Sequence, residues 1–226
     1  MGRHENDDLK RRIEAWRHFG SRELDDCREF HLRIGEQRWH GENAVLQQTW
    51  RKLLLSLMVF LGEPTDEATR LSYQKKEWGR QPGDTCVVEL SGLAAHSLKT
   101  QRDRECFRAE RISDIRARIH SYNPAFVIMY GKSRNCRKAW TAIADSAALI
   151  RQPFAFAEFR KCGSTVFALT PHPTSWGPTN EDWIELGNQL RALVEVRPQL
   201  PAQCSRTGSV ENRLPLFLSA ARRNPR

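Results

Sequence analysis

The sequence predicts an α/β fold, a three-layer α/β/α arrangement around a central, mostly parallel sheet of four strands. Two observations lead to this prediction. Short apolar runs rich in β-branched and aromatic residues, typical of buried strands, occur at residues 85–90, 125–130 and 165–169. Helical patterns separate these runs, and strands that alternate with helices favour a parallel sheet with helices on both of its faces.

The first elements of the domain have the weakest strand pattern. Residues Glu29–Ile34 are expected to form the first strand, and a polar and aromatic loop with glycine at both ends, Gly35–Gly41, follows it. Asn43 can then cap a helix that runs to Leu61, and Gly62 provides a natural stop.

Helices and strands alternate in the rest of the chain. The expected order begins with a helix from Thr65 or Asp66 to Trp78, the strand 85–90, a helix over 103–122 and the strand 125–130. A helix over 134–150, the strand 165–169 and a helix over 181–194 capped by Thr179 or Asn180 follow. The segment 154–159 could add a further strand to the four of the expected sheet.

The chain divides into one domain and two tails. Residues 1–28 read as a charged helical arm, and residues 29–197 hold all the expected strands. Residues 198–226 are rich in proline, serine and arginine, which predicts a basic and disordered tail.

The composition indicates a soluble protein with an anionic partner. A net charge of +9 favours nucleic acid, DNA above all, before a membrane surface. The alternative is that the charge only aids solubility. The amino-terminal segment is too charged for a signal peptide, and the longest apolar run is too short to span a bilayer, so we expect a soluble, cytoplasmic protein with no membrane partner. We also expect a monomer.

The six cysteines are scattered, and none forms a C-x-x-C pair. We therefore interpret them as reduced thiols and expect neither a metal nor another cofactor.

The most informative loop is Pro171–Gly177. It follows a strand pattern and precedes a helix, and ligands of open α/β sheets bind at such strand ends. His172 lies between two prolines, which restrict its backbone. The alternative interpretation is an ordinary loop before a capped helix.

Three strand-end loops, Gly35–Gly41, Glu89–Ser97 and Pro171–Gly177, together resemble those of the uracil-DNA glycosylase superfamily. That family has a three-layer α/β/α fold, a first loop that reads GQDPYHG or GEAPG, and a late loop that reads HPSP. Here the first loop reads GEQRWHG and the late loop HPTS. The resemblance covers roughly residues 30–195.

The resemblance implies a role for each matching residue in the late and first loops. His172 would donate a hydrogen bond to a base oxygen as negative charge develops on the leaving base. Trp39 would pack against the extruded base. The remaining contacts implied for the nucleotide involve Gly35, Gln37, His40, Ser91, Pro173, Thr174 and Ser175, of which the last three would hold a phosphate.

Two departures from the family pattern concern the carboxylate that positions water. Gln37 stands where the family has an aspartate, and Glu36 could substitute for it, as the glutamate of GEAPG would. Glu89 stands where the family reads the base with an asparagine. An ionised carboxylate only accepts hydrogen bonds, so Glu89 would favour a base edge with donors, would help position water, or would be a buried carboxylate with structural partners.

The sequence thus supports three functional hypotheses. The first is a DNA glycosylase, a hydrolase of base-excision DNA repair, with phosphate contacts from Lys99, Arg102, Arg104, Lys132 and Arg134. The second is a non-catalytic nucleic-acid-binding protein on the same fold. The third is an α/β enzyme that acts on a small phosphorylated metabolite.

Overall fold

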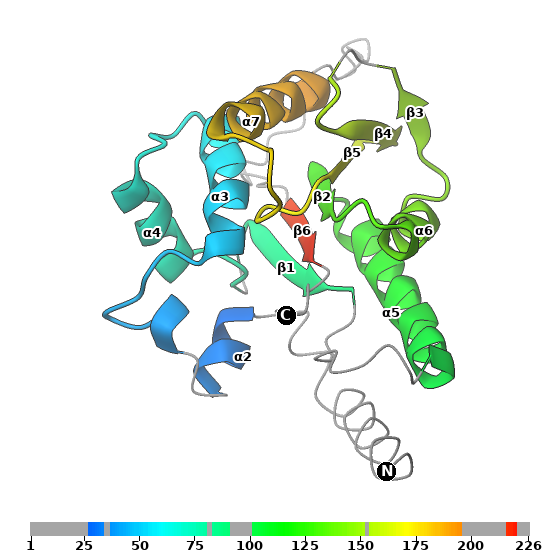
Figure 1. Cartoon of the computed structure of the whole chain (residues 1–226), viewed down its shortest axis with the longest axis horizontal. Helices are drawn as coiled ribbons and strands as arrows, with labels where there is room; N and C mark the ends of the chain where they lie inside the picture. Colours follow the sequence, from blue (N-terminus) through cyan, green and yellow to red (C-terminus); the bar gives the residue numbers. More distant parts are fainter. Residues whose placement is uncertain are drawn as a thin grey trace, which may run out of the picture.

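The computed structural model of the 226-residue chain describes residues 27–33, 37–80, 83–90, 101–151, 154–195 and 216–220. Within these residues, six strands form one sheet in the order β1-β6-β2-β5-β4-β3 (Figure 1). The strands are β1 (Thr85–Glu89), β2 (Phe126–Tyr130), β3 (Ala148–Ile150), β4 (Glu158–Cys162), β5 (Thr165–Thr170) and β6 (Leu216–Ala220). The helices are α2 (Cys27–Arg33), η1 (Gln37–Trp39, a 3₁₀ turn), α3 (Gln48–Leu61), α4 (Glu67–Lys76), α5 (Gln101–Tyr122), α6 (Arg134–Ile143) and α7 (Asn180–Glu195).

The strand pairings confirm the mixed α/β class. β1 pairs with β6, β6 with β2, and β2 with β5, each in parallel. β4 and β3 then extend the sheet through antiparallel pairs. The described sheet therefore has two strands more than the four expected from the sequence.

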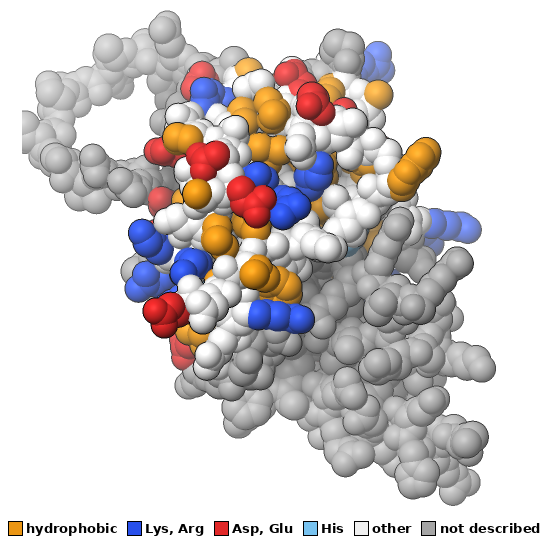
Figure 2. Space-filling view, turned by 60° about the vertical axis from the view of Figure 1, so that its left-hand side comes forward, with side chains coloured by type: hydrophobic (Ala, Val, Ile, Leu, Met, Phe, Trp, Pro, Cys, Tyr) orange, Lys and Arg blue, Asp and Glu red, His pale blue; other side chains and the backbone are white. Residues whose placement is uncertain are grey.

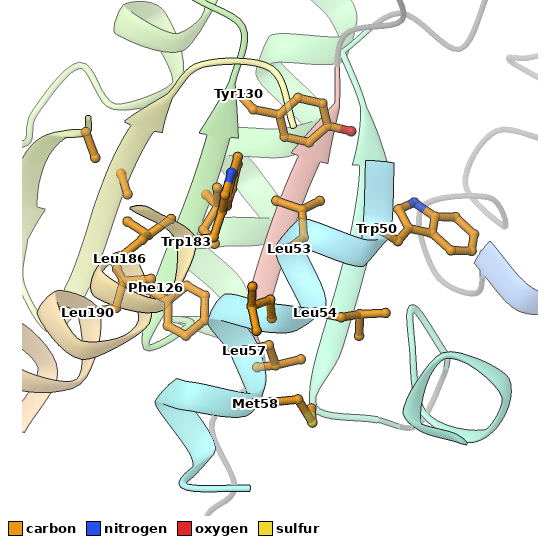
Figure 3. Close-up of a cluster of buried hydrophobic side chains, with 14 of the residues drawn as sticks. Trp50, Leu53, Leu54, Leu57, Met58, Phe126, Tyr130, Trp183, Leu186 and Leu190 are labelled. Atoms are coloured by element: carbon orange, nitrogen blue, oxygen red, sulfur yellow. The ribbon is translucent and has the colours of Figure 1, made fainter. Parts of the chain in front are cut away.

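The two faces of the sheet pack against different helices. Alternate residues of a strand point to opposite faces, and on β2 the side chains of Phe126 and Ile128 join a core cluster with α3 and α7. Val127 and Met129 join a second cluster with α5 and α6. Figure 3 shows the first cluster, in which Phe126 lies against α7 and the leucines of α3.

Helices α3 and α7 approach each other closely. The helix α7 carries Gly187, where an added Cβ would lie 2.5 Å from the Ser56 carbonyl oxygen and 2.7 Å from Val59 Cβ. The Ser56 hydroxyl also donates a hydrogen bond of 2.6 Å to the Trp183 carbonyl. A glycine is needed at this crossing because the α3 backbone occupies the space of a side chain.

The expectation of a disordered tail over residues 198–226 is wrong for residues 216–220. These residues form β6, which lies between β1 and β2 (Figure 1, red). Leu218 is the register partner of both Val87 and Ile128. The proline- and arginine-rich surroundings hid this short apolar run, and the other residues of the tail lie outside the described residues.

The first strand expected from the sequence, Glu29–Ile34, is also wrong. Residues Cys27–Arg33 form α2, whose Cys27 packs into the core against Gly79 and Val87. A short segment with few apolar residues is compatible with one face of a short helix as well as with an edge strand, so the apolar pattern of residues 29–34 does not distinguish the two. Apart from Cys27 and Arg28, the expected arm 1–28 lies outside the described residues.

Several element boundaries differ from those expected. The helix expected from Asn43 begins at Gln48, because the Gln47 side chain accepts a hydrogen bond from the Trp50 amide and caps it. The helix expected over 134–150 ends at Ile143, and residues 148–150 form β3 instead. The further strand expected over 154–159 lies at 158–162. The caps expected at Asp66 and Gly62 are confirmed.

The position of β6 predicts that the domain fails to fold without it. A chain that ends at Arg213 lacks β6 and leaves the facing edges of β1 and β2 without a partner. A chain that ends at Ala220 keeps all the paired residues of β6. We expect the longer chain to unfold cooperatively in denaturant and the shorter one to lose its cooperative transition, as followed by circular dichroism. If both chains unfolded with the same cooperative transition, the placement of β6 between β1 and β2 would be contradicted.

Candidate functional site

The pairing of β2 with β5 brings two strand-end loops together. Tyr130 and Thr170, the last residues of these strands, are register partners. The residue that follows Tyr130, Gly131, donates a hydrogen bond of 3.0 Å from its amide to the Thr170 carbonyl. Gly131 has a φ of 99°, which few other residues adopt. The loops at 131–133 and 171–177 therefore begin side by side at the carboxyl ends of parallel strands, where α/β folds bind ligands.

His172 is buried and held on several sides. Its Nδ1 accepts a hydrogen bond of 3.2 Å from the Thr174 amide, and the Thr174 hydroxyl lies 2.9 Å from the same nitrogen. The ring packs edge-on against Tyr130, with centroids 5.2 Å apart. Its carbonyl accepts hydrogen bonds from the amide and the hydroxyl of Ser175.

These contacts define the tautomer of His172. A ring nitrogen that accepts a hydrogen bond carries no proton, so the proton of the neutral imidazole must lie on Nε2. Thr174 holds Nδ1 of the ring, and Ser175 holds the His172 carbonyl. The Nε2–H group therefore has a fixed direction. Such a donor can stabilise negative charge that develops on a ligand atom.

The rest of the late loop ends in a reciprocal cap and carries an exposed aromatic residue. The Thr179 hydroxyl accepts from the Asp182 amide, and the Asp182 carboxylate accepts from the Thr179 amide at 2.7 Å. Thr179 is therefore the cap of α7, one of the two residues that the sequence offered. Trp176 has a relative exposure of 101%. Sequence reasoning missed Trp176, although a large aromatic residue in a loop of prolines beside His172 was a usable signal.

In the neighbouring loop, Lys132 and Arg134 differ in their availability. The Lys132 ammonium donates a hydrogen bond of 2.9 Å to the Phe156 carbonyl. Burial lowers the pKa of the Lys132 amine, although Glu158 works against this effect and Arg137 reinforces it. Arg134 is exposed at the start of α6. Of these two expected phosphate contacts, Arg134 has the more accessible side chain.

Three of the candidate nucleotide contacts in the loop Gly35–Gly41 are described by the structure, and two of them, Trp39 and His40, pack against the rest of the domain. Gln37 is exposed, whereas Trp39 packs against Trp50 of α3 with ring centroids 6.4 Å apart. His40 is only 4% exposed, and its Nδ1 lies 3.3 Å from the Gln74 carbonyl of α4. The contacts of Trp39 and His40 thus join them to α3 and α4, while those of His172 join it to β2 and its own loop.

The other candidates lie partly or wholly outside the described residues. Gly35, Glu36, Ser91 and Lys99 lie outside them. Glu89 is the last residue of β1, and Arg102 and Arg104 lie in the first turn of α5; for these three the structure describes the backbone alone. Their roles stay predictions. Pro173 is buried beside His172, and Thr174 is exposed.

The structure also brings together three residues that sequence reasoning did not combine. Cys27, His31 and His40 each offer one ligand atom, and these atoms lie within 4.8 Å of one another. The interpretation of residues 29–34 as a strand concealed this group. In a strand, residues 27 and 31 would be about 13 Å apart, whereas on a helix residues four apart are neighbours at about 6 Å.

The larger of two described hollows lies at the opposite end of the strands. Its volume is about 370 Å³, and its lining includes Asn123 before β2, Thr165 at the start of β5, and Arg116 and His120 on α5. A smaller hollow of about 120 Å³ lies between α6 and the strands β4 and β5, with Arg137 and Glu158 in its lining. The larger hollow is therefore distinct from the loops around His172.

The described surface does not present a uniformly basic face in the view of Figure 2. Lysine and arginine side chains lie among aspartate, glutamate and hydrophobic groups on this face. Some basic groups are paired: Arg137 contacts both carboxylate oxygens of Glu158, at 2.7 and 2.8 Å, and Arg51 lies 3.4 Å from Glu67. An excess of basic residues in the sequence therefore does not by itself locate a nucleic-acid surface.

Comparison with family models, with curated proteins and with solved structures found no match to this chain. In the part of the chain that the structure describes, no helix is both long enough and apolar enough to cross a membrane.

The hydrogen bond from the Thr174 amide predicts the tautomer that can be measured for His172. With isotope-labelled histidine, NMR at a pH where the ring is neutral should find the proton on Nε2, with the resonance assigned by loss in His172→Gln. Thr174→Pro removes both donors and should leave a mixture of tautomers. A proton on Nδ1 in the wild-type protein would contradict the geometry of the loop.

Proposed function

We propose that this chain is a DNA glycosylase-like hydrolase that binds a nucleotide flipped out of the base stack and hydrolyses its N-glycosidic bond. The observation that carries the proposal is the fixed Nε2 donor of His172 at the ends of β2 and β5. The proposed scaffold is the three-layer α/β/α fold with a mostly parallel sheet. Apolar clusters on both faces of the sheet and the parallel pairs of β1, β6, β2 and β5 support it.

The chemistry requires a group that stabilises the leaving base. When the bond between the sugar and the base breaks, its electron pair goes to the base, whose oxygen becomes more negative. The Nε2–H of His172 donates a hydrogen bond to that oxygen, and burial of the ring strengthens this interaction because little water competes. A neutral histidine suffices, since the donor does not need to transfer its proton.

The residues around His172 suit the recognition of a flipped nucleotide. The exposed indole of Trp176 offers a stacking surface, and base–aromatic stacking is worth about 1–3 kcal/mol per base. The exposed guanidinium of Arg134 can contact a phosphate, whereas the amides and hydroxyls of Thr174 and Ser175 already donate to His172. These groups favour nucleic acid over a small metabolite because Trp176 projects outward rather than into a cavity.

The nucleophile in this proposal is water. Its oxygen attacks the anomeric carbon of the sugar while a carboxylate, Glu36 or Glu89, accepts the proton that water loses. Gln37 has no carboxylate and is exposed, so it cannot take that role. The role of each glutamate is a prediction from the sequence.

The second candidate is a non-catalytic nucleic-acid-binding protein on the same fold, and the neutral Gln37 favours it. Such a protein would keep His172, Trp176 and Arg134 as contacts to nucleic acid and would lack water activation. The proposed cytoplasmic location and monomeric state apply equally to both candidates.

A panel of labelled oligonucleotides tests the catalytic proposal. Each carries one uracil, hypoxanthine, xanthine or mismatched base, as a single strand or a duplex, and alkali cleaves any abasic site that forms. We expect cleavage of at least one substrate by the wild-type protein and a loss of about 100-fold or more in His172→Ala, which removes the charge-stabilising donor.

His120→Ala is the matched control, because His120 is an exposed histidine on α5. It should retain the wild-type rate. Salt-sensitive binding without cleavage of any substrate would favour the non-catalytic candidate, and the absence of both binding and cleavage would reject the nucleic-acid function.

A further inference from the structure

The side chains of Cys27, His31 and His40 converge on one point. Cys27 Sγ lies 3.4 Å from His31 Nδ1, and the same nitrogen lies 3.3 Å from His40 Nε2. The two imidazole rings stack with centroids 5.4 Å apart. One thiol and two imidazoles thus present their sulfur and nitrogen atoms to a shared space at the junction of α2 and η1.

Two of the three separations match those of a tetrahedral zinc site, and the three ligand atoms all lie within 4.8 Å of one another. Zinc binds thiolate sulfur at about 2.3 Å and imidazole nitrogen at about 2.0–2.1 Å. At tetrahedral angles, two such ligands are about 3.5 Å apart when one is sulfur and about 3.3 Å apart when both are nitrogen. The distances from His31 Nδ1 to Cys27 Sγ and to His40 Nε2 therefore need little change on metal binding, and Cys27 Sγ and His40 Nε2 must come to about 3.5 Å of each other.

A neighbouring carbonyl orients one of the ligands. His40 Nδ1 lies 3.3 Å from the Gln74 carbonyl, which can only accept a hydrogen bond, so Nδ1 carries the proton and Nε2 presents its lone pair to the cluster. Metal-binding histidines commonly have such a partner on the nitrogen that does not bind the metal.

The Gln74 side chain fixes the same loop. It is fully buried, accepts from the Gln47 amide at 3.0 Å, and donates to the carbonyls of Trp39 at 2.8 Å and Val45 at 2.9 Å. The position of His40 is therefore set by α4 whether or not a metal is bound.

Two of the three ligands are buried, and the third, His31, is half-buried. Cys27 is 7% exposed and His40 is 4% exposed, and the Trp50 ring lies 5.4–5.6 Å from the rings of both histidines. The Cys27 amide also donates a hydrogen bond of 2.8 Å to the Gly79 carbonyl. A metal here would tie α2 and η1 to the part of the core that α3 and α4 form.

We propose that Cys27, His31 and His40 bind one zinc ion, with water as the fourth ligand. Sulfur and imidazole ligands select zinc over magnesium or calcium, which prefer oxygen. On binding, the Cys27 thiol releases its proton to solvent, and His31 carries its proton on Nε2 so that Nδ1 coordinates the metal. The role is to hold α2 against the domain, and it does not depend on glycosylase activity.

Cobalt substitution tests the site in the full-length protein. The chain is stripped of metal with a chelator, kept reduced, and titrated with Co²⁺. We expect one equivalent to give the intense visible bands of tetrahedral cobalt and a near-ultraviolet thiolate-to-cobalt band, and zinc to displace both. Cys27→Ser should lose the thiolate band. Loss of an outer-shell partner of a metal ligand typically weakens metal binding by about 10–100-fold. His40→Gln removes a ligand itself and should weaken cobalt binding by at least as much.

Cys162→Ser and His120→Gln are the matched controls, since they replace a cysteine of β4 and a histidine of α5. Both should bind cobalt as the wild type does. Zinc should also raise the melting temperature of the wild type and of both controls but not that of Cys27→Ser. A wild-type protein without the tetrahedral spectrum, or a thiolate band that persists in Cys27→Ser, would overturn the proposal, and the wild-type result stands even if a variant misfolds.

Discussion

The parallel pairing of β2 with β5 is the constraint on which the candidate site depends. It aligns Tyr130 with Thr170, and the chain beyond each strand must then leave the sheet at the same edge. The Gly131 amide joins the two exits through the Thr170 carbonyl. His172 follows two residues later, with Tyr130 beneath its ring and Thr174 on its Nδ1. The orientation of the imidazole thus follows from strand register and a short loop, with no contribution needed from a bound ligand.

The central strands were predictable from the sequence because their signals are local. The apolar runs of β1, β2 and β5 are bounded by turn residues, and each is long enough to show its type. β6 has a comparable run, but its neighbours in the sheet are distant in the sequence, and only tertiary pairing decides whether such a segment joins. The prediction of a strand where α2 lies was wrong for a related reason, since a short segment with few core contacts carries little periodicity.

The candidate site shows the same division. His172 was predictable because two prolines and a capped helix surround it in the sequence. The group of Cys27, His31 and His40 required the helical geometry of α2 and the support of Gln74 from α4, neither of which the C-x-x-C rule examines. The burial of His40 and the partial burial of Trp39 likewise follow from packing on Trp50. If zinc binds there, the loop Gly35–Gly41 helps to hold α2 against the domain, in addition to any contact that it makes with a nucleotide.

The central functional claim is that the edge formed by β2 and β5 receives a base drawn out of a duplex. The most direct measurement uses a duplex with a fluorescent adenine analogue that brightens when it leaves the stack. The account predicts a salt-sensitive rise in fluorescence with the wild-type protein, even if no bond is cleaved, and a smaller rise with Trp176→Ala. Binding without any rise in fluorescence would contradict the account, because the duplex would then be held with its bases stacked.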